Sequence, residues 1–379
     1  MSFIFLKYKN SDKCSNRLLL KKFTLSLHIN SERFFVEKES AVLLLFTGGT
    51  ISMSEDPTTG ALRPIDFDRL LDYMPELKQT GIKIKCIPFL PFIDSSDVHP
   101  EIWERLAKTI EENYNEFDGF VVLHGTDTMA YTASALSFML ENLSKPVIFT
   151  GAQLPIGMMR SDAKENMLTA IEIATAKESG QSIVPEVCIF FEDTLFRGNR
   201  TTKKNAEHFN AFNSYNYPPL AKAGVHIKYF RTYIHYPHSG TNMRVRTKID
   251  PNVAILKLFP GITEHTVRAI LNIPDLKAVV LESFGAGNAP RRQWFYDALR
   301  EATDRGLIIV NKSQCSTGSV EMGRYETSLN LVTAGVMSGY DCTTEAIVTK
   351  LMHLLAEYPE NDDIRHRLSI SLCGEMTVI

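Results

Sequence analysis

Two continuous apolar runs, each followed at once by a short segment rich in glycine and threonine, most narrowly constrain the fold of this chain. The first run is Ala41 to Phe46, and TGGTI follows it at residues 47–51. The second run is Gly119 to Leu123, and HGTDTM follows it at residues 124–129. Uninterrupted apolar runs of this length are typical of strands covered on both faces, as in a parallel sheet. Because ligands of open α/β sheets bind at the carboxyl ends of strands, we expect both polar segments at a functional site.

The remainder of the sequence predicts alternating strands and helices. In the first half, strands are expected at 82–92, 146–150 and 187–191, and helices at 101–114, 128–142 and 163–177. In the second half, strand-like runs at 253–259, 278–281 and 306–310 are each followed by a helical pattern, and a last long helix is expected at 343–358. This order predicts an α/β protein with two α/β domains, a larger N-terminal mixed or parallel sheet flanked by helices and a smaller C-terminal parallel-sheet domain.

The periodicity fades between about residues 215 and 251, where Pro, His, Tyr and Gly accumulate, and this favours a domain boundary. The length of 379 residues also favours two domains over one. We therefore expect four parts, which are a poorly ordered N-terminal extension at 1–40, a catalytic domain at 41–235, a linker at 236–252 and a C-terminal domain at 253–379.

Charge and cysteine content exclude several classes of partner. The formal net charge is -3, without a block of five like charges, so neither nucleic acid nor an anionic membrane is an expected partner. The 6 cysteines are scattered, without a C-x-x-C pair or metal-ligand spacing to histidine, so no metal site is expected. The sequence has no apolar stretch near the ~18 residues of a membrane helix and no secretory h-region, so we expect a cytoplasmic protein with reduced thiols.

Chemistry at the two threonine segments needs a base, because a threonine hydroxyl is a weak nucleophile at neutral pH. The candidates are Asp127 and Lys203, which ends the segment RGNRTTK. A lysine acts as a base only when burial or nearby cations lower its pKa, and the nearby cations could be Arg197, Arg200 and Lys204. The glycines beside the threonines would let the backbone approach a substrate and donate N–H groups to a developing oxyanion.

Each feature alone has an ordinary structural explanation. A Gly-Gly pair after a strand is usually a tight turn, Asp127 could cap the following helix, and Lys203 could be solvated. His124, at the end of an apolar run, is expected to be a hydrogen-bonded core histidine and not a base or ligand. The joint occurrence of these residues at strand ends is what indicates a threonine-dependent amidohydrolase.

Four motifs together resemble the bacterial-type asparaginase family, specifically its cytoplasmic type I branch. They are TGGTI, HGTDTMAYTASALSFMLENL, RGNRTTK and GAGNAP, and the resemblance covers residues 41–379. It implies hydrolysis of the side-chain amide of L-asparagine without a cofactor. It also implies that Thr50 is the nucleophile. Thr126, Asp127 and Lys203 would transfer the proton and anchor the substrate. Ser95 and Ser96 match the family's clamp on the substrate α-carboxylate, and Asp127 would hold the α-ammonium group.

The sequence departs from the family pattern at two places. Residues 60–64 read GALRP where a lid loop with Gly-Tyr-x-Pro is expected, so the lid tyrosine is missing. The family's second asparagine site, an effector site, is matched by Thr202 and Cys315, but Glu282 stands where an arginine is expected. A glutamate repels the carboxylate that an arginine would bind. We therefore expect the rate to depend hyperbolically, not sigmoidally, on asparagine. The alternative is that Glu282 pairs with a nearby cation and the effector binds in another pose.

The resemblance further implies a homo-oligomer, a dimer of dimers in which the second domain of a neighbour completes each site. Two other functions stay open, an asparaginase-like subunit of a glutamyl-tRNA amidotransferase and a catalytically silent amino-acid-binding regulator. A nucleotide-binding oxidoreductase is a poor fit, because Pro290 replaces the third glycine in what would be half of a dinucleotide fingerprint.

Overall fold

The computed structural model describes residues 39–55, 62–64, 74–323 and 326–378. Residues 39–379 form one compact unit. The expected N-terminal extension therefore lies almost entirely outside the described residues, as do the first two residues of the GALRP stretch. The expected domain boundaries stay predictions.

The larger sheet has 8 strands in the order β15-β14-β11-β10-β7-β5-β1-β4. Its strands are β1 (Ala41–Gly48), β4 (Lys83–Ile93), β5 (Gly119–Leu123), β7 (Val147–Thr150), β10 (Val187–Phe191), β11 (Thr194–Arg197), β14 (Ala221–Lys222) and β15 (Lys228–Tyr229). The five strands from β10 to β4 are parallel, whereas β11, β14 and β15 each pair antiparallel with their neighbours. The expected mixed or parallel sheet is thus confirmed.

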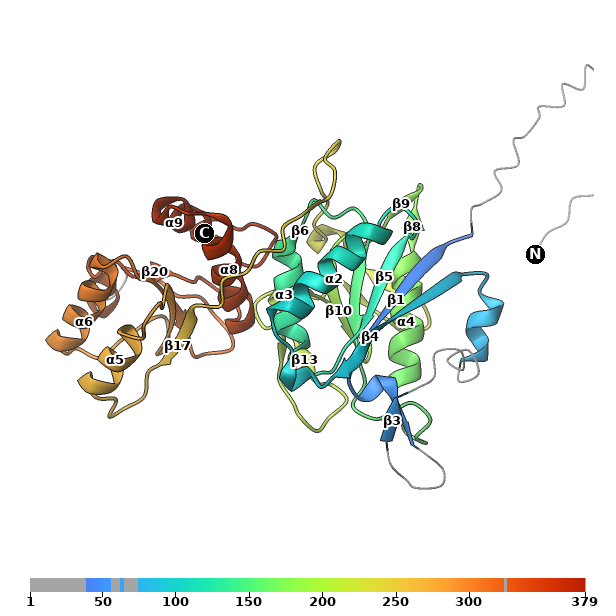
Figure 1. The fold of residues 1–379 in the computed structure, drawn as a ribbon, viewed down its shortest axis with the longest axis horizontal. Helices are drawn as coiled ribbons and strands as arrows, with labels where there is room; N and C mark the ends of the chain where they lie inside the picture. The colour runs from blue at the N-terminus through green and yellow to red at the C-terminus, as the bar shows by residue number, and fades with distance from the viewer. Residues whose placement is uncertain (1–38, 56–61, 65–73, 324–325, 379) are drawn as a thin grey trace, which may run out of the picture. The chain divides into compact units, whose positions relative to one another are not determined.

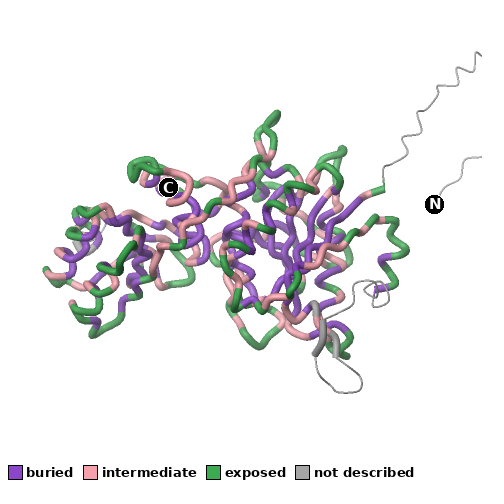
Figure 2. The backbone as a smooth tube through the Cα atoms, viewed as in Figure 1, coloured by how far each residue is buried: buried purple, intermediate pink, exposed green. Residues whose placement is uncertain are grey.

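Helices cover both faces of this sheet, which explains the uninterrupted apolar runs. The helices are α2 (Pro100–Asn113), α3 (Met129–Met139) and α4 (Ala163–Thr175). Leu43 and Leu45 of β1 pack in the core under α2 and α3, whereas Val42 and Leu44 pack under α4 on the other face (Figure 1). All four side chains are fully buried, and each is expected to stabilise the fold by about 1.5–3 kcal/mol. The central strands β1, β5, β7 and β10 are buried throughout, and Figure 2 shows the middle of the sheet mostly in the colour of buried residues.

The smaller sheet has 4 parallel strands, β17 (Val253–Lys257), β18 (Ala278–Ser283), β19 (Ile308–Ser313) and β20 (Met337–Ser338). One face is covered by α5 (Glu264–Leu271), α6 (Gln293–Asp304) and α7 (Glu326–Thr333), and the other by α8 (Thr344–Glu357) and α9 (Asn361–Leu368). The expected second α/β sheet is confirmed. The sequence did not predict β20, because it has only two residues, or α9, because only Ile364 and Leu368 of its eight residues are buried.

The two sheets are joined through helix packing, since α3 of the larger sheet contacts α8 of the smaller one. The helix expected at 128–142 ends at Met139, because Leu140 and Glu141 form β6 and pair with β16 (Arg244–Val245). The short elements are η1 (Thr50–Ser52), β2 (Met53–Glu55), β3 (Leu62–Pro64), η3 (Pro75–Gln79), η4 (Ser95–Asp97), β8 (Lys177–Glu178), β9 (Gln181–Ser182), η5 (Gly198–Arg200), β12 (Thr202–Lys203), β13 (Phe212–Asn213) and η6 (Arg231–Tyr233).

Candidate active site

Three loops meet at glycine contacts beyond the carboxyl ends of β1, β4 and β5. Gly49 has a φ of 80°, and a Cβ atom there would lie 2.4 Å from the Cα of Gly125. A Cβ atom at Gly125 would lie 2.5 Å from the hydroxyl oxygen of Ser95. Only glycine fits these backbone approaches. Thr50 and Thr126 each follow one of these glycines, so the contact brings both threonines to one edge of the sheet.

Lys203 is held against Thr126 and Asp127. Its Nζ lies 2.7 Å from the Thr126 hydroxyl and 2.7 Å from Oδ1 of Asp127. The lysine side chain is 17% exposed, whereas the Asp127 side chain is 64% exposed. Lys203 ends the two-residue strand β12, and Asp127 lies two residues before the start of α3 at Met129. The three residues assigned to a relay thus form a hydrogen-bonded group that is open to solvent on the aspartate side.

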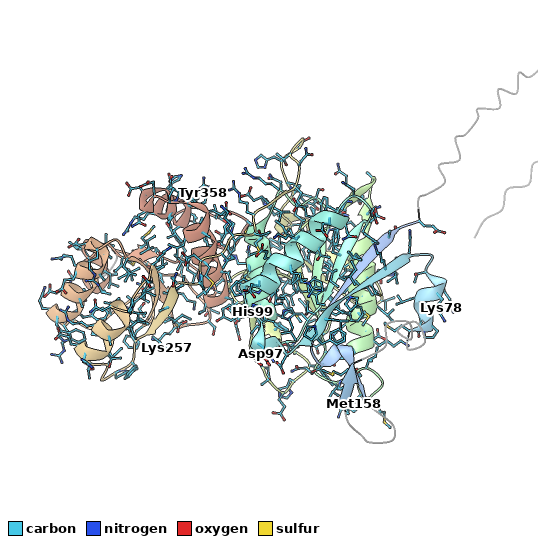
Figure 3. The ribbon with its side chains drawn as sticks, viewed as in Figure 1. Lys78, Asp97, His99, Met158, Lys257 and Tyr358 are labelled. Carbon is cyan, nitrogen blue, oxygen red and sulfur yellow. The ribbon has the colours of Figure 1, made fainter. Side chains whose placement is uncertain are left out.

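Ser95 and Ser96 lie in η4, the short turn that ends at Asp97, which is labelled in Figure 3. Ser95 is buried, and its carbonyl accepts a 2.6 Å hydrogen bond from the Thr128 hydroxyl. Ser96 is exposed, and both its N–H and its hydroxyl donate to Oδ1 of Asp94 at 2.9 Å. These two bonds lower the pKa of Asp94. The two serines therefore present one buried and one exposed hydroxyl beside the Gly125 loop.

Thr50 opens η1 and is half-buried. Among the described residues, its hydroxyl has no hydrogen-bond partner. Ile51, the next residue, is fully buried in the core under α4, so it fixes the position of this turn. The Thr50 hydroxyl is therefore held in place by its backbone and is not already bonded to another described side chain.

His124 is a core histidine with both ring nitrogens hydrogen-bonded, as expected. Its Nδ1 lies 2.7 Å from the Gly125 carbonyl, and its Nε2 lies 3.0 Å from the Thr132 hydroxyl. Burial lowers the pKa of His124 to about 4, although the hydrogen bond to Gly125 opposes the shift. A neutral imidazole with both nitrogens bonded is not available as a base at neutral pH.

Arg197 and Arg200 do not serve as free cations beside Lys203, which corrects one expectation from the sequence. Arg197 makes a bidentate pair with Glu186, at 2.6 and 3.1 Å. Arg200 pairs with Asp341 at 2.9 Å. Both guanidinium groups are buried, and each has an anionic partner that offsets its charge.

Sequence reasoning missed Gln153, which lies in the loop after β7. Its Oε1 accepts a long hydrogen bond, 3.4 Å, from the Thr126 hydroxyl. The carboxylate of Asp162 holds this loop by accepting the N–H groups of Gln153 and Leu154, each at 3.1 Å. Asn166 adds a 2.9 Å bond to the Gly151 carbonyl. The only signal in the sequence was a polar residue just past the end of an expected strand.

The possible effector site consists of Thr202, Glu282 and Cys315. All three residues line one cavity of about 220 Å³. Glu282 is buried, accepts a 2.8 Å hydrogen bond from Thr344, and lies 3.5 Å from Nζ of Lys257. Thr202 donates a 2.5 Å bond to Glu345, whose pKa is raised by burial. Glu282 is thus paired with a nearby cation, and the cavity wall carries three carboxyl groups, those of Glu282, Asp341 and Glu345.

Within the described part of the chain, no group of three His, Cys, Asp or Glu residues could hold a metal ion. The described helices also include none that is long and apolar enough to cross a membrane.

Two sequence families match this chain. Residues 41–235 match the family described as "Asparaginase, N-terminal", and residues 252–368 match the "Glutaminase/Asparaginase C-terminal domain".

Individual relatives are similar to this chain over 90% of its length. L-asparaginase 1 of Escherichia coli K12 is 43% identical over 346 residues, which is 90% of this chain and 99% of the relative. A mouse protein named 60 kDa lysophospholipase is 45% identical over 362 residues, 90% of this chain and 63% of the relative. The crystal structure of L-asparaginase I from Vibrio cholerae matches with a TM-score of 0.81 and 38% identity, over 90% of this chain and 100% of that one.

Proposed function

This chain belongs to the asparaginase family, and we infer from that membership that it is an L-asparaginase, which hydrolyses the side-chain amide of L-asparagine to L-aspartate and ammonia. The observation that supports this chemistry best in the structure is the position of Lys203, whose Nζ lies 2.7 Å from both Thr126 and Asp127. A hydroxyl, an amine and a carboxylate in direct contact can move a proton between substrate and nucleophile.

In the reaction that we propose, the Thr50 hydroxyl oxygen attacks the amide carbon of the substrate. The threonine proton passes through Thr126 and Lys203 to the leaving nitrogen, and the C–N bond breaks to release ammonia. This leaves an aspartyl ester on Thr50. Water then attacks the ester carbon, its proton returns to the Thr50 oxygen, and L-aspartate leaves. The contact of the Thr50 loop with Gly125 supports this assignment, as does a Thr50 hydroxyl without a hydrogen-bond partner among the described residues.

Asp127 gives the relay a way to respond to substrate. In the free site its Oδ1 lies 2.7 Å from Nζ of Lys203. Because most of the Asp127 side chain is exposed, the substrate α-ammonium group can approach it and compete for the same carboxylate. Substrate binding would then weaken the contact between Lys203 and Asp127.

The remaining substrate contacts come from the loops that meet at the glycines. We propose that the hydroxyls of Ser95 and Ser96 hold the α-carboxylate. The backbone N–H groups beside Gly49 and Gly125 are the candidates for stabilising the oxyanion that forms on the amide carbon. Both groups lie on the same edge of the sheet as Thr126, as one small substrate requires.

The test is ammonia release by the purified protein from L-asparagine and from L-glutamine, with and without EDTA. We expect ammonia from asparagine and no effect of the chelator. Activity that appears only with a second protein and tRNA would indicate the amidotransferase subunit, and asparagine binding without ammonia release would indicate the silent regulator. A lysophospholipid is the comparison substrate, because the mouse relative is named for that class.

The acylated threonine can be located directly. Acid quenching during turnover followed by peptide mass spectrometry should find the aspartyl group on the peptide that contains Thr50. The same group on the peptide that contains Thr126 would assign the nucleophile to the second threonine. Trypsin separates the two positions because several lysines lie between them.

We also propose that the enzyme is cytoplasmic and works as a dimer of dimers. Both proposals rest on the resemblance of the sequence motifs to the cytoplasmic type I branch of the family. Light scattering combined with an activity assay tests the assembly, and a fully active monomer would contradict it.

A further inference from the structure

The residues just before Lys203 are bound by a segment that lies about 170 residues later in the sequence. The segment comprises residues 371–377 and is called here the clamp segment. It follows α9 and contacts η5, the short turn that connects β11 to the strand carrying Lys203. None of its residues touches the proposed catalytic group itself in the described structure.

Three residues around η5 donate hydrogen bonds to the clamp segment. Arg200 donates from Nε to the Gly374 carbonyl at 2.8 Å and from Nη2 to the Thr377 hydroxyl at 3.0 Å. Asn199 donates to the carbonyl and to the sulfur of Cys373, at 3.2 and 3.1 Å. Arg197 donates to the Gly374 carbonyl at 3.3 Å. All three donors are at least 96% buried, so each unpaired group would be costly.

The clamp segment is itself fixed by a buried ion pair. Lys350 of α8 lies 2.7 Å from Glu375, and both side chains are 0% exposed. The Glu375 carboxylate also accepts the N–H groups of Leu372 and Cys373 at 2.9–3.0 Å. Removing one partner of a buried pair leaves an uncompensated charge. The segment therefore has one strongly preferred position relative to α8.

The strand that carries Lys203 is held to α8 at a second point. Thr202 donates a 2.5 Å bond to Glu345 in the first turn of that helix. Asp341 completes the arrangement, since its carboxylate pairs with Arg200 at 2.9 Å and accepts the Thr377 N–H at 2.7 Å. The backbone from η5 to Lys203 is thus tied to the smaller sheet on both sides.

We propose that the clamp segment is a positioning element for Lys203, which sets the place from which the lysine reaches Thr126 and Asp127. This inference rests on the proposed role of Lys203 in turnover. If η5 shifts, Lys203 shifts with it, because only Thr201 and Thr202 separate Arg200 from the lysine. The alternative is that these contacts only stabilise the fold, and the two ideas predict different kinetics.

Gly374→Ala tests the proposal. Gly374 has a φ of 82°, and a Cβ atom there would lie 2.4 Å from Nη1 and 2.8 Å from Cζ of Arg197. Because Arg197 is held by Glu186, the clamp segment must move away from η5. Gly335→Ala is the matched control, with a φ of 78° and a Cβ position 3.0 Å from the Thr303 hydroxyl, between α6 and α7 of the smaller sheet. Thr377→Val is a milder second variant that removes one bond to Arg200.

We expect kcat to fall about 10-fold in Gly374→Ala and about 3-fold in Thr377→Val, since small displacements of a catalytic group have effects of this size. Gly335→Ala should stay within about 2-fold of the unchanged protein, because its backbone strain is similar but remote. If Gly374→Ala does not fold, the kcat of Thr377→Val tests the proposal instead. Unchanged kcat in the folded clamp variants would overturn the proposal.

Each clamp variant is also made together with Lys203→Met. A segment that acts through Lys203 has no further effect on kcat once the lysine amine is gone, whereas a purely structural role lowers kcat equally in both backgrounds. Equal losses in both backgrounds would therefore overturn the inference. Near-normal turnover of Lys203→Met alone would instead show that the proposed role of Lys203 is wrong.

Discussion

Thr126→Val removes one hydroxyl while keeping the shape of the side chain, so it isolates the relay. In the structure this hydroxyl lies 2.7 Å from Nζ of Lys203 and 3.4 Å from Oε1 of Gln153. Without it, Lys203 keeps only its bond to Asp127, and the proton path from Thr50 is interrupted. Because nucleophile and relay act as a unit, we expect kcat to fall at least ~100-fold.

The effect on stability should be small by comparison. Lys203 keeps its partner Asp127, and this pair is partly exposed, so the free energy of unfolding should fall by about 1 kcal/mol or less. Thr150→Val is the matched control. Its hydroxyl is fully buried at the end of the neighbouring strand β7 and donates to the Phe190 carbonyl at 2.8 Å. The control should lose about 1 kcal/mol of stability with little change in kcat.

The assay is steady-state ammonia release for both variants, together with urea unfolding. Near-normal kcat in Thr126→Val would refute the relay. A comparable fall in Thr150→Val would show that any lost hydroxyl near the strand ends disturbs the site, and the argument from the Lys203 contact would fail.

Three further predictions can be checked with the same protein. Thr50→Ala should lower kcat at least ~100-fold, and a variant that turns over asparagine at a near-normal rate would remove Thr50 as the nucleophile. The rate should depend hyperbolically on asparagine, because Glu282 places a carboxylate in the wall of the effector cavity; initial rates with a Hill coefficient clearly above one would contradict this. The free energy of unfolding should fall as the pH drops from about 6.5 towards about 4. Burial lowers the pKa of His124 and His353 to about 4 in the folded protein. The unfolded chain therefore binds protons at these histidines at a higher pH than the folded protein does. Urea unfolding at pH 7 and pH 4.5 measures this loss, and His353→Leu should reduce it.

Local sequence was enough to predict most of the secondary structure. The run at Val187 to Phe191 was expected as a strand and forms β10 with the same bounds. The helix expected at 343–358 is α8, one residue shorter at each end. Prediction failed where pairing between distant residues decides the structure. Leu140 and Glu141 continue a helical pattern, but hydrogen bonds to Arg244 and Val245 draw them into a strand.

The place of the candidate site in the fold could be predicted from local sequence. Apolar runs covered on both faces place TGGTI and HGTDTM at strand ends, and their glycines permit the backbone contact between the two loops. The position of the strands and the close approach of the two loops both depend on residues close together in the chain. The spacing of the apolar residues defines the strands, and the missing Cβ atoms of the glycines permit the approach. The side-chain contacts within the site could not be predicted in this way, because no local sequence pattern specifies them.

The contacts of each charged residue depend on how distant segments of the chain pack together. Lys203 reaches Thr126 across 77 residues of sequence, and Arg200 bonds Gly374 across 174. The same fold pairs Arg197 with Glu186, so this arginine is not a free cation beside Lys203, and it places Glu282 beside Lys257. The physical reason is that a buried charge must find a partner wherever packing brings one, and packing joins segments whose separation along the chain carries no periodic signal.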